Sequence, residues 1–107
     1  MLSKELVAAC SRPLVLTLLQ GNESYGYDLI RRVRELSHQQ LEWTEGTLYP
    51  VLHRLEREGL IKATWREAGT GRRRKYYTLT AAGQSALSAE KKHWLIAHNL
   101  LETLWNR

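Results

Sequence analysis

Four consecutive basic residues, Arg72 to Lys75, form the densest cluster of charge in the sequence. They follow a glycine-containing turn at residues 68–71, and Lys62 and Arg66 lie shortly before that turn. Residues 62–75 carry a net charge of +5, which equals the formal net charge of the whole chain. Clustered cations bind polyanions well because phosphates release counterions when they are neutralised. The segment therefore predicts phosphate binding, as in nucleic acid, with a solvated charge run as the alternative.

Other residue types that support chemistry are few and scattered. The four histidines fall on different predicted elements or, for His93 and His98, about 140° apart on one helix. The chain has a single cysteine, Cys10, in an apolar stripe where a buried inert thiol is more common than a redox sensor. The sequence predicts no metal site, no cofactor and no nucleophile–base–acid set of an enzyme.

Length and composition indicate a single folded domain. The chain has 107 residues, of which 43% are hydrophobic and 25% charged, as in ordinary globular proteins. No apolar run approaches the roughly 20 residues that span a bilayer, and the N-terminus lacks a signal-peptide pattern. We expect a cytoplasmic protein that makes no membrane contact.

The first part of the sequence predicts a helix over residues 3–19, because apolar side chains recur at three- and four-residue spacings. Pro13 lies inside this range. The helix therefore either kinks at the proline or restarts from Ser11 with the proline in its first turn. Residues 20–22 form a break before the next element.

Two more helices follow the break. Ser24 is placed to cap a second helix, whose apolar stripe lies within residues 29–36. Residues 41–43 predict a short strand, and Thr44 caps a third helix that ends near Gly59. The buried face of this third helix is formed by Leu48, Val51, Leu52 and Leu55.

The opposite face of the third helix is free for a partner. At 100° per residue, Gly46, Pro50, His53 and Arg57 point away from the buried face. Pro50 also predicts irregular or 3₁₀-like first turns.

The last third of the sequence predicts a hairpin and a long helix. Apolar and polar residues alternate over residues 61–66, and a second strand at 72–79 follows the turn at 68–71. Thr80 then caps a helix that runs to about Asn106, about 39 Å at 1.5 Å per residue.

The order helix, helix, short strand, helix, hairpin is typical of a winged helix-turn-helix, whose third helix enters the major groove of DNA. We therefore expect a mainly α fold with a small β-hairpin wing, an α+β arrangement. Its winged helix-turn-helix DNA-binding domain covers residues 1–80, and a C-terminal dimerisation helix covers residues 81–107. The two parts form one structural unit.

Three stretches of the sequence resemble a known family. They are Gly26-Tyr27, "GTLYPVLHRLEREGLI" at residues 46–61, and "GRRRKYYTLTAAG" at residues 71–83. Together they resemble the PadR-like family of transcriptional regulators over nearly the whole chain. The likeness is greatest to the short subfamily with one C-terminal dimerisation helix, which includes multidrug-responsive repressors. This resemblance implies a homodimeric DNA-binding repressor.

The candidate DNA contacts lie in the wing and on the third helix. The cations of residues 72–75 can pair with phosphates, and an arginine at the wing tip can enter the minor groove. By analogy with the family's recognition helix, four side chains of the third helix reach phosphates or base edges: Thr47, Tyr49, His53 and Arg54. Packing is the alternative role for Tyr25, Tyr27 and Tyr49. The candidates are Tyr25, Thr47, Tyr49, Pro50, His53, Arg54, Arg72, Arg73, Arg74, Lys75 and Tyr76.

The last helix carries more apolar surface than one domain can cover. Part of it can pack on the first helix, and the remainder must meet a second chain. Lys91 and His98 weaken the seam as a pure coiled coil, so the partner's first helix is expected to contribute. The predicted dimer interface comprises Leu87, Trp94, Ala97, His98, Leu101, Leu104 and Trp105.

Trp94 has two roles open to it. In the multidrug-responsive members that the sequence resembles, an aromatic residue near the middle of this helix lines a pore between protomers and stacks flat, often cationic, compounds. Trp94 and His98 are therefore candidate ligand-binding residues for a planar aromatic or cationic effector. The alternative is that Trp94 only packs the interface.

These observations predict a transcriptional regulator that acts as a homodimeric repressor and binds double-stranded DNA at a pseudo-palindromic operator. A planar aromatic ligand at the dimer interface is expected to relieve the repression. One alternative is a constitutive or architectural DNA-binding protein without a ligand. Another is a winged-helix protein-interaction module, which the concentrated charge of the wing disfavours.

Overall fold

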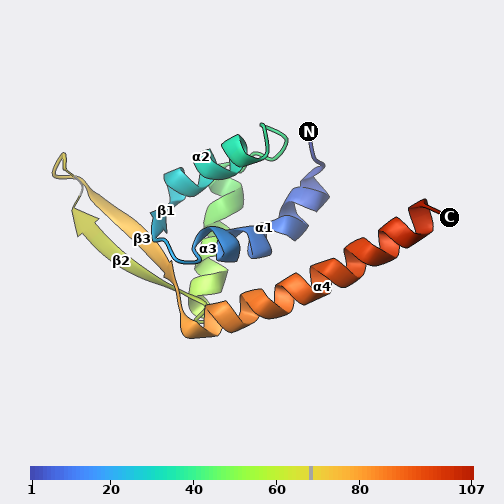
Figure 1. Ribbon diagram of the computed structural model, residues 1–107. Coiled ribbons are helices and arrows are strands. Elements are labelled where there is room, and N and C mark those ends of the chain that lie inside the picture. Colours follow the sequence, from blue (N-terminus) through green and yellow to red (C-terminus); the bar gives the residue numbers. More distant parts are fainter. Residues whose placement is uncertain (68) are drawn as a thin grey trace.

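The computed structural model describes residues 1–67 and 69–107. Three helices gather into a core, the hairpin projects from one end, and the last helix extends in the opposite direction (Figure 1). This arrangement confirms the predicted mainly α fold with a β-hairpin wing. The elements are α1 (Lys4–Leu18), β1 (Ser24–Tyr25), α2 (Gly26–Leu36), α3 (Glu45–Arg57), β2 (Ile61–Glu67), β3 (Arg73–Leu79) and α4 (Ala81–Trp105).

The first helix continues through its proline. Pro13 lies inside α1, so the alternative of a restart at Ser11 is wrong. Ser11 is buried and its hydroxyl donates to the Val7 carbonyl oxygen at 2.6 Å while it accepts a hydrogen bond from the indole of Trp43 at 3.0 Å. The ribbon of α1 changes direction partway along its length (Figure 1), as expected where a proline removes a helical hydrogen bond.

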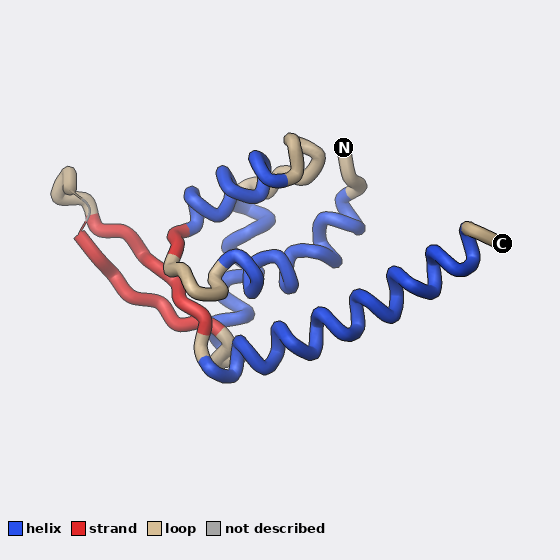
Figure 2. Tube along the Cα trace, viewed as in Figure 1, coloured by secondary structure: helices blue, strands red, loops and turns tan. Residues whose placement is uncertain are grey.

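A two-residue strand replaces the predicted cap of α2. Ser24 pairs with Tyr77 and Tyr25 with Tyr76, so β1 joins the hairpin in a three-stranded antiparallel sheet of order β1-β3-β2. The residue before α2 is Tyr25, and the Ser24 hydroxyl instead donates to Asp28 Oδ2 at 2.6 Å. The prediction that Ser24 caps the helix is therefore wrong. Figure 2 shows the strands grouped at the end of the molecule away from the C-terminus.

The predicted strand at residues 41–43 is also wrong. These residues form an irregular connection that follows a tight turn, in which His38 and Gln39 have φ of 52° and 66°. Leu41 and Trp43 are buried and Glu42 between them is exposed. The alternation thus arises from burial against the core without strand pairing.

The third helix begins where the sequence predicted. The Thr44 hydroxyl accepts a hydrogen bond from the Thr47 backbone N–H at 3.1 Å, which confirms the cap. The helix is regular from Glu45 through Pro50, so the predicted irregular first turns are wrong. Gly46 and Pro50 are both exposed, so solvent can reach the carbonyl group that the proline leaves without a donor. Gly59, with φ of 76°, turns the chain into β2.

The core holds only the beginning of α4. A side chain on Gly83 would overlap the backbone carbonyl of Leu60, so this glycine lets α4 start in close contact with the turn before β2. Leu87 is fully buried, and the helix then leaves the core. The radius of gyration is accordingly 15.2 Å, above the about 13 Å expected for a compact domain of this length. No helix in the described residues is long and apolar enough to cross a membrane.

Candidate nucleic-acid interface

One face of the wing carries two tyrosine rings packed edge to face, each with a guanidinium group over it. The rings of Tyr25 and Tyr76 lie 5.3 Å apart at 75° to each other. Arg74 Cζ lies 4.4 Å from the centre of the Tyr25 ring, and Arg66 Cζ lies 5.5 Å from that of Tyr76. A guanidinium stacked on a ring is held in place while its N–H edges remain able to donate. Arg66 also pairs with Glu23, so Arg74 is the better placed of the two for a phosphate.

The other face of the wing turns toward the helices. Tyr77 is 1% exposed there, and burial raises the pKa of its hydroxyl. Lys75 Nζ donates to Glu56 Oε1 of α3 at 3.3 Å. Partial burial alone would lower the pKa of Lys75, but Tyr77 and Glu56 outweigh it and raise that pKa. Lys75 therefore links the wing to α3 through its ion pair with Glu56, and this carboxylate already partly compensates its charge.

Farther out on this inner face, the hairpin extends beyond the helices. Trp65 lies opposite Lys75 in the strand register and is 55% exposed. The guanidinium carbon of Arg73 lies 5.4 Å from the centre of the Trp65 ring. The end of the wing therefore presents a flat aromatic surface next to a cation.

A groove of about 700 Å³ lies between the wing, the start of α2 and the exposed face of α3, and its lining includes residues from both faces of the wing. Tyr49 packs closely on Gly26, where a Cβ atom would lie 2.5 Å from the tyrosine hydroxyl oxygen. The ring of His53 lies 6.4 Å from that of Tyr49. Cations outnumber acids in the lining, which comprises Tyr25, Gly26, Tyr27, Glu45, Tyr49, His53, Trp65, Arg72, Arg73, Arg74, Lys75 and Tyr77.

The structure brings most of the predicted DNA contacts together in this groove. Tyr25, Tyr49, His53 and residues 72–75 all line it. The other four candidates lie elsewhere. Thr47 is engaged at the cap, with its hydroxyl oxygen 2.9 Å from that of Thr44, and Tyr76 lies on the outer face of the wing. Exposed positions on α3 are occupied by Pro50 and Arg54.

The groove also contains residues outside the predicted set. These include Glu45 and Trp65. Tyr27, for which phosphate contact and packing were both open, lies in the first turn of α2, is 64% exposed and also lines the groove. The alternation over residues 61–66 puts Trp65 on the same face of β2 as Ile61, yet Ile61 is buried and Trp65 is 55% exposed. The available signal was distance along the strand, because Trp65 lies four residues beyond Ile61, which is buried in the core.

Of the residues predicted to contact a second chain through α4, one is buried in the single chain and the others are exposed. Leu87 is fully buried within its own chain, so the prediction that Leu87 contacts a second chain is wrong. Beyond it, Trp94 is 37% exposed and Trp105 is 71% exposed. The other predicted interface residues are also exposed: Ala97, His98, Leu101 and Leu104. Further apolar surface on α4 comes from Leu95, Ile96 and Leu100.

The three-helix core, the hairpin and the groove between α3 and the hairpin define a winged helix-turn-helix protein. Residues 15–89 match the model of the transcriptional regulator PadR-like family. The chain belongs to this family and is a transcriptional regulator, as the three sequence stretches indicated. Regulators of the PadR family bind DNA.

Individual relatives agree with this assignment. The chain is 37% identical over 89 residues to transcriptional regulator Rv3488 of Mycobacterium tuberculosis. The matched region covers 83% of this chain and 79% of that protein. It is 34% identical over 84 residues to the negative transcriptional regulator PadR of Bacillus subtilis, which covers 78% of this chain and 44% of that protein. A transcriptional regulator structure from Clostridium thermocellum is similar with a TM-score of 0.87 at 26% identity, covering 96% of this chain and 97% of that one.

Proposed function

We propose that the protein is a homodimeric transcriptional repressor that binds a pseudo-palindromic operator. The observation that carries this proposal is the cationic, aromatic groove between the exposed face of α3 and the wing. In this arrangement α3 lies in the major groove and the wing follows the adjacent phosphates. The name of the Bacillus subtilis relative, a negative regulator, supports repression as the outcome.

Dimerisation is proposed from the surface of α4. The face of α4 that buries Leu87 in the core and carries Trp94 beyond it continues, at heptad spacing, as Leu101 and Trp105. These two side chains are 44% and 71% exposed in the single chain. A second copy of the chain would cover them and place two α3 helices for two half-sites.

A planar aromatic or cationic ligand is proposed to bind near Trp94 and His98. Trp94 forms one wall of an apolar groove of about 320 Å³ between α1 and α4, which also includes Leu14, Thr17 and Leu41. Such a ligand relieves repression only if it prefers a dimer arrangement that fits DNA less well. The test is titration of the dimer with an intercalating dye. Trp94→Ala should abolish tight binding while the dimer persists, and unchanged dye affinity would contradict this ligand site.

DNA binding itself is tested by mobility shift with promoter DNA from the protein's own locus, with random duplex as competitor. The proposal expects a specific complex that random DNA displaces poorly. His53→Ala should reduce the preference for operator over random DNA by about 1–3 kcal/mol if α3 reads bases. Equal losses on both DNAs would contradict that assignment, and absence of any DNA complex would favour a protein-interaction module.

A further inference from the structure

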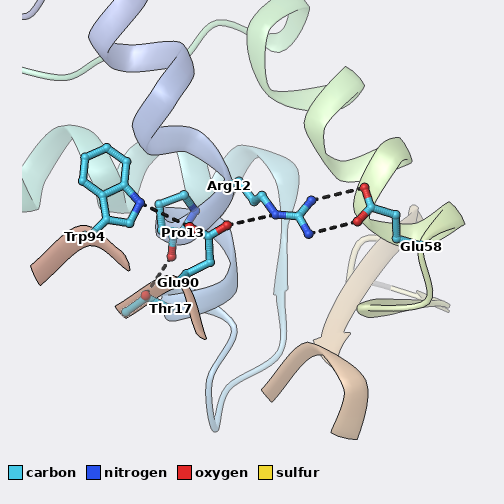
Figure 3. A network of polar contacts seen from close by, with 6 residues as sticks. All are labelled: Arg12, Pro13, Thr17, Glu58, Glu90 and Trp94. Carbon is cyan, nitrogen blue, oxygen red and sulfur yellow. Dashed lines mark hydrogen bonds and ion pairs between the residues drawn. The ribbon is translucent and has the colours of Figure 1, made fainter. Parts of the chain in front are cut away.

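Arg12 of α1 holds carboxylates from two other helices. Its Nη1 and Nη2 donate to Glu58 Oε2 at 3.2 Å and Glu58 Oε1 at 2.9 Å, and its Nε donates to Glu90 Oε1 at 3.1 Å. Glu58 is the C-cap residue that directly follows α3, and Glu90 lies in α4. Figure 3 shows the guanidinium between the two carboxylates. A single side chain therefore connects the helix that faces the DNA groove with the long helix.

The geometry of this contact is more restrictive than that of an ordinary surface pair. Isolated exposed ion pairs contribute little, whereas bidentate arginine–carboxylate contacts within a network are the recognised exception. Arg12 is 36% exposed, Glu90 22% and Glu58 40%, so the Glu90 side of the contact is partly shielded from solvent and the Glu58 side is open to it. The planar guanidinium fixes the directions of all three donors, which a lysine ammonium cannot do.

The contact extends to Trp94. The indole Nε1 of Trp94 donates to Glu90 Oε2 at 3.2 Å, while Arg12 occupies the other oxygen of the same carboxylate (Figure 3). The orientation of the indole and the position of Arg12 are thus joined through one side chain of α4.

A small change at this point has a large effect at the end of α4. Trp105 lies 15 residues beyond Glu90, so a tilt of about 5° there moves the end of the helix by about 2 Å at 1.5 Å per residue. In a dimer built on α4, the same tilt changes the separation of the two α3 helices. Half-site spacing on DNA must match that separation.

We propose that Arg12 is a positioning residue that fixes the angle between α3 and α4 and so sets the half-site spacing that the dimer accepts. Trp94 supports this setting through Glu90. The proposal rests on the proposed function, because it requires a dimer that reads two half-sites.

The experiment compares operator duplexes with the natural spacing between half-sites and with one base pair inserted or removed at the centre. Affinity is measured for the parent protein, Arg12→Ala, Arg12→Lys and Trp94→Phe, which retains a ring but lacks the indole donor. The matched control is Arg31→Ala, since Arg31 forms two ion pairs within α2 and lies outside the network. Arg12→Lys keeps the charge in case the alanine variant does not fold.

The parent and the control should lose about tenfold or more in affinity when the spacing changes. Both Arg12 variants should reduce that loss to about threefold or less, and Trp94→Phe should fall between, with binding to a single half-site unchanged in all variants. Arg12 variants that keep the parent's spacing dependence would overturn the proposal. So would Arg12 variants that weaken binding to a single half-site as much as binding to the full operator. A parent protein without any spacing dependence would overturn the proposed dimeric function as well.

Discussion

The ring of Tyr49 in α3 rests on Gly26 at the start of α2, so closely that a Cβ atom there would lie 2.5 Å from the hydroxyl oxygen and 2.8 Å from Cζ of the ring. This contact joins the first two motifs of the sequence in space. The Tyr49 side chain packs on the core and also lines the groove, so packing does not remove it from the candidate DNA contacts.

Gly26→Ala should displace the Tyr49 ring and weaken DNA binding, with a loss of about 1–3 kcal/mol in the free energy of unfolding. Gly46→Ala is the control, because a Cβ there meets nothing closer than 3.8 Å and replaces a helical glycine. The Gly46→Ala protein should be at least as stable to unfolding as the parent, because its methyl group lies in the first turn of α3 and meets no close neighbour. Urea unfolding of both variants measures the two effects, and equal stabilities would contradict the close contact.

Gly83→Ala should destabilise the protein more than Gly26→Ala does. Its methyl group would overlap the Leu60 backbone carbonyl and approach Leu79, and a backbone group in the core cannot swing aside as a tyrosine can. We expect the free energy of unfolding to fall by about 3 kcal/mol, and the packing around Leu87 to loosen. The measurement is again urea unfolding, and a loss smaller than that of Gly26→Ala would argue against the seating of α4.

Local signals account for the elements that the sequence predicted well. The caps at Thr44 and Thr80, the alternation in the hairpin and the length of α4 all depend on neighbours along the chain. The strand at Ser24 was missed because it is two residues long and exists only through pairing with β3, which is distant in sequence. For the same reason a heptad pattern could not show that Leu87 faces its own core.

The candidate site divides in the same way. The run of charge at residues 72–75 was evident from the sequence, as was the exposed face that carries His53. The partners of those cations were not. Arg74 on Tyr25, Arg73 on Trp65 and Lys75 with Glu56 are contacts between elements that only the folded chain brings together.

Replacing Arg72, Arg73 and Arg74 by alanine should weaken binding to every DNA sequence and flatten its salt dependence. Each lost phosphate contact lowers the slope of log affinity against log salt by about 0.9. A double change at Lys92 and Arg107, exposed residues of the last helix and C-terminus, removes charge away from the wing and should leave the slope nearly intact. The readout is affinity across a salt series, and an unchanged slope in the wing variant would remove the wing from the interface.

Acid should release the contact between Arg12 and Glu58. Hydrogen bonds from Arg12 hold the pKa of Glu58 below its ordinary value. Because the folded-state pKa is lowered, the stabilisation is complete above the unfolded value of about 4.3 and is lost as pH falls through the folded value. Carboxyl NMR titration should show the Glu58 pKa rising toward the ordinary value in Arg12→Ala, and the same pKa in both proteins would contradict the contact.

In the proposed function, two copies of the chain, joined through α4, read one operator. Sedimentation analysis of the protein with its operator measures this directly, using Leu101→Glu with Leu104→Glu against the control Thr103→Glu. Both leucines are exposed in the single chain, at 44% and 48%, so the charges need not disturb its core. The parent and the control should bind as two chains per operator, whereas the leucine variant should be monomeric and lose tight binding. A monomeric leucine variant with the parent's operator affinity would contradict the account.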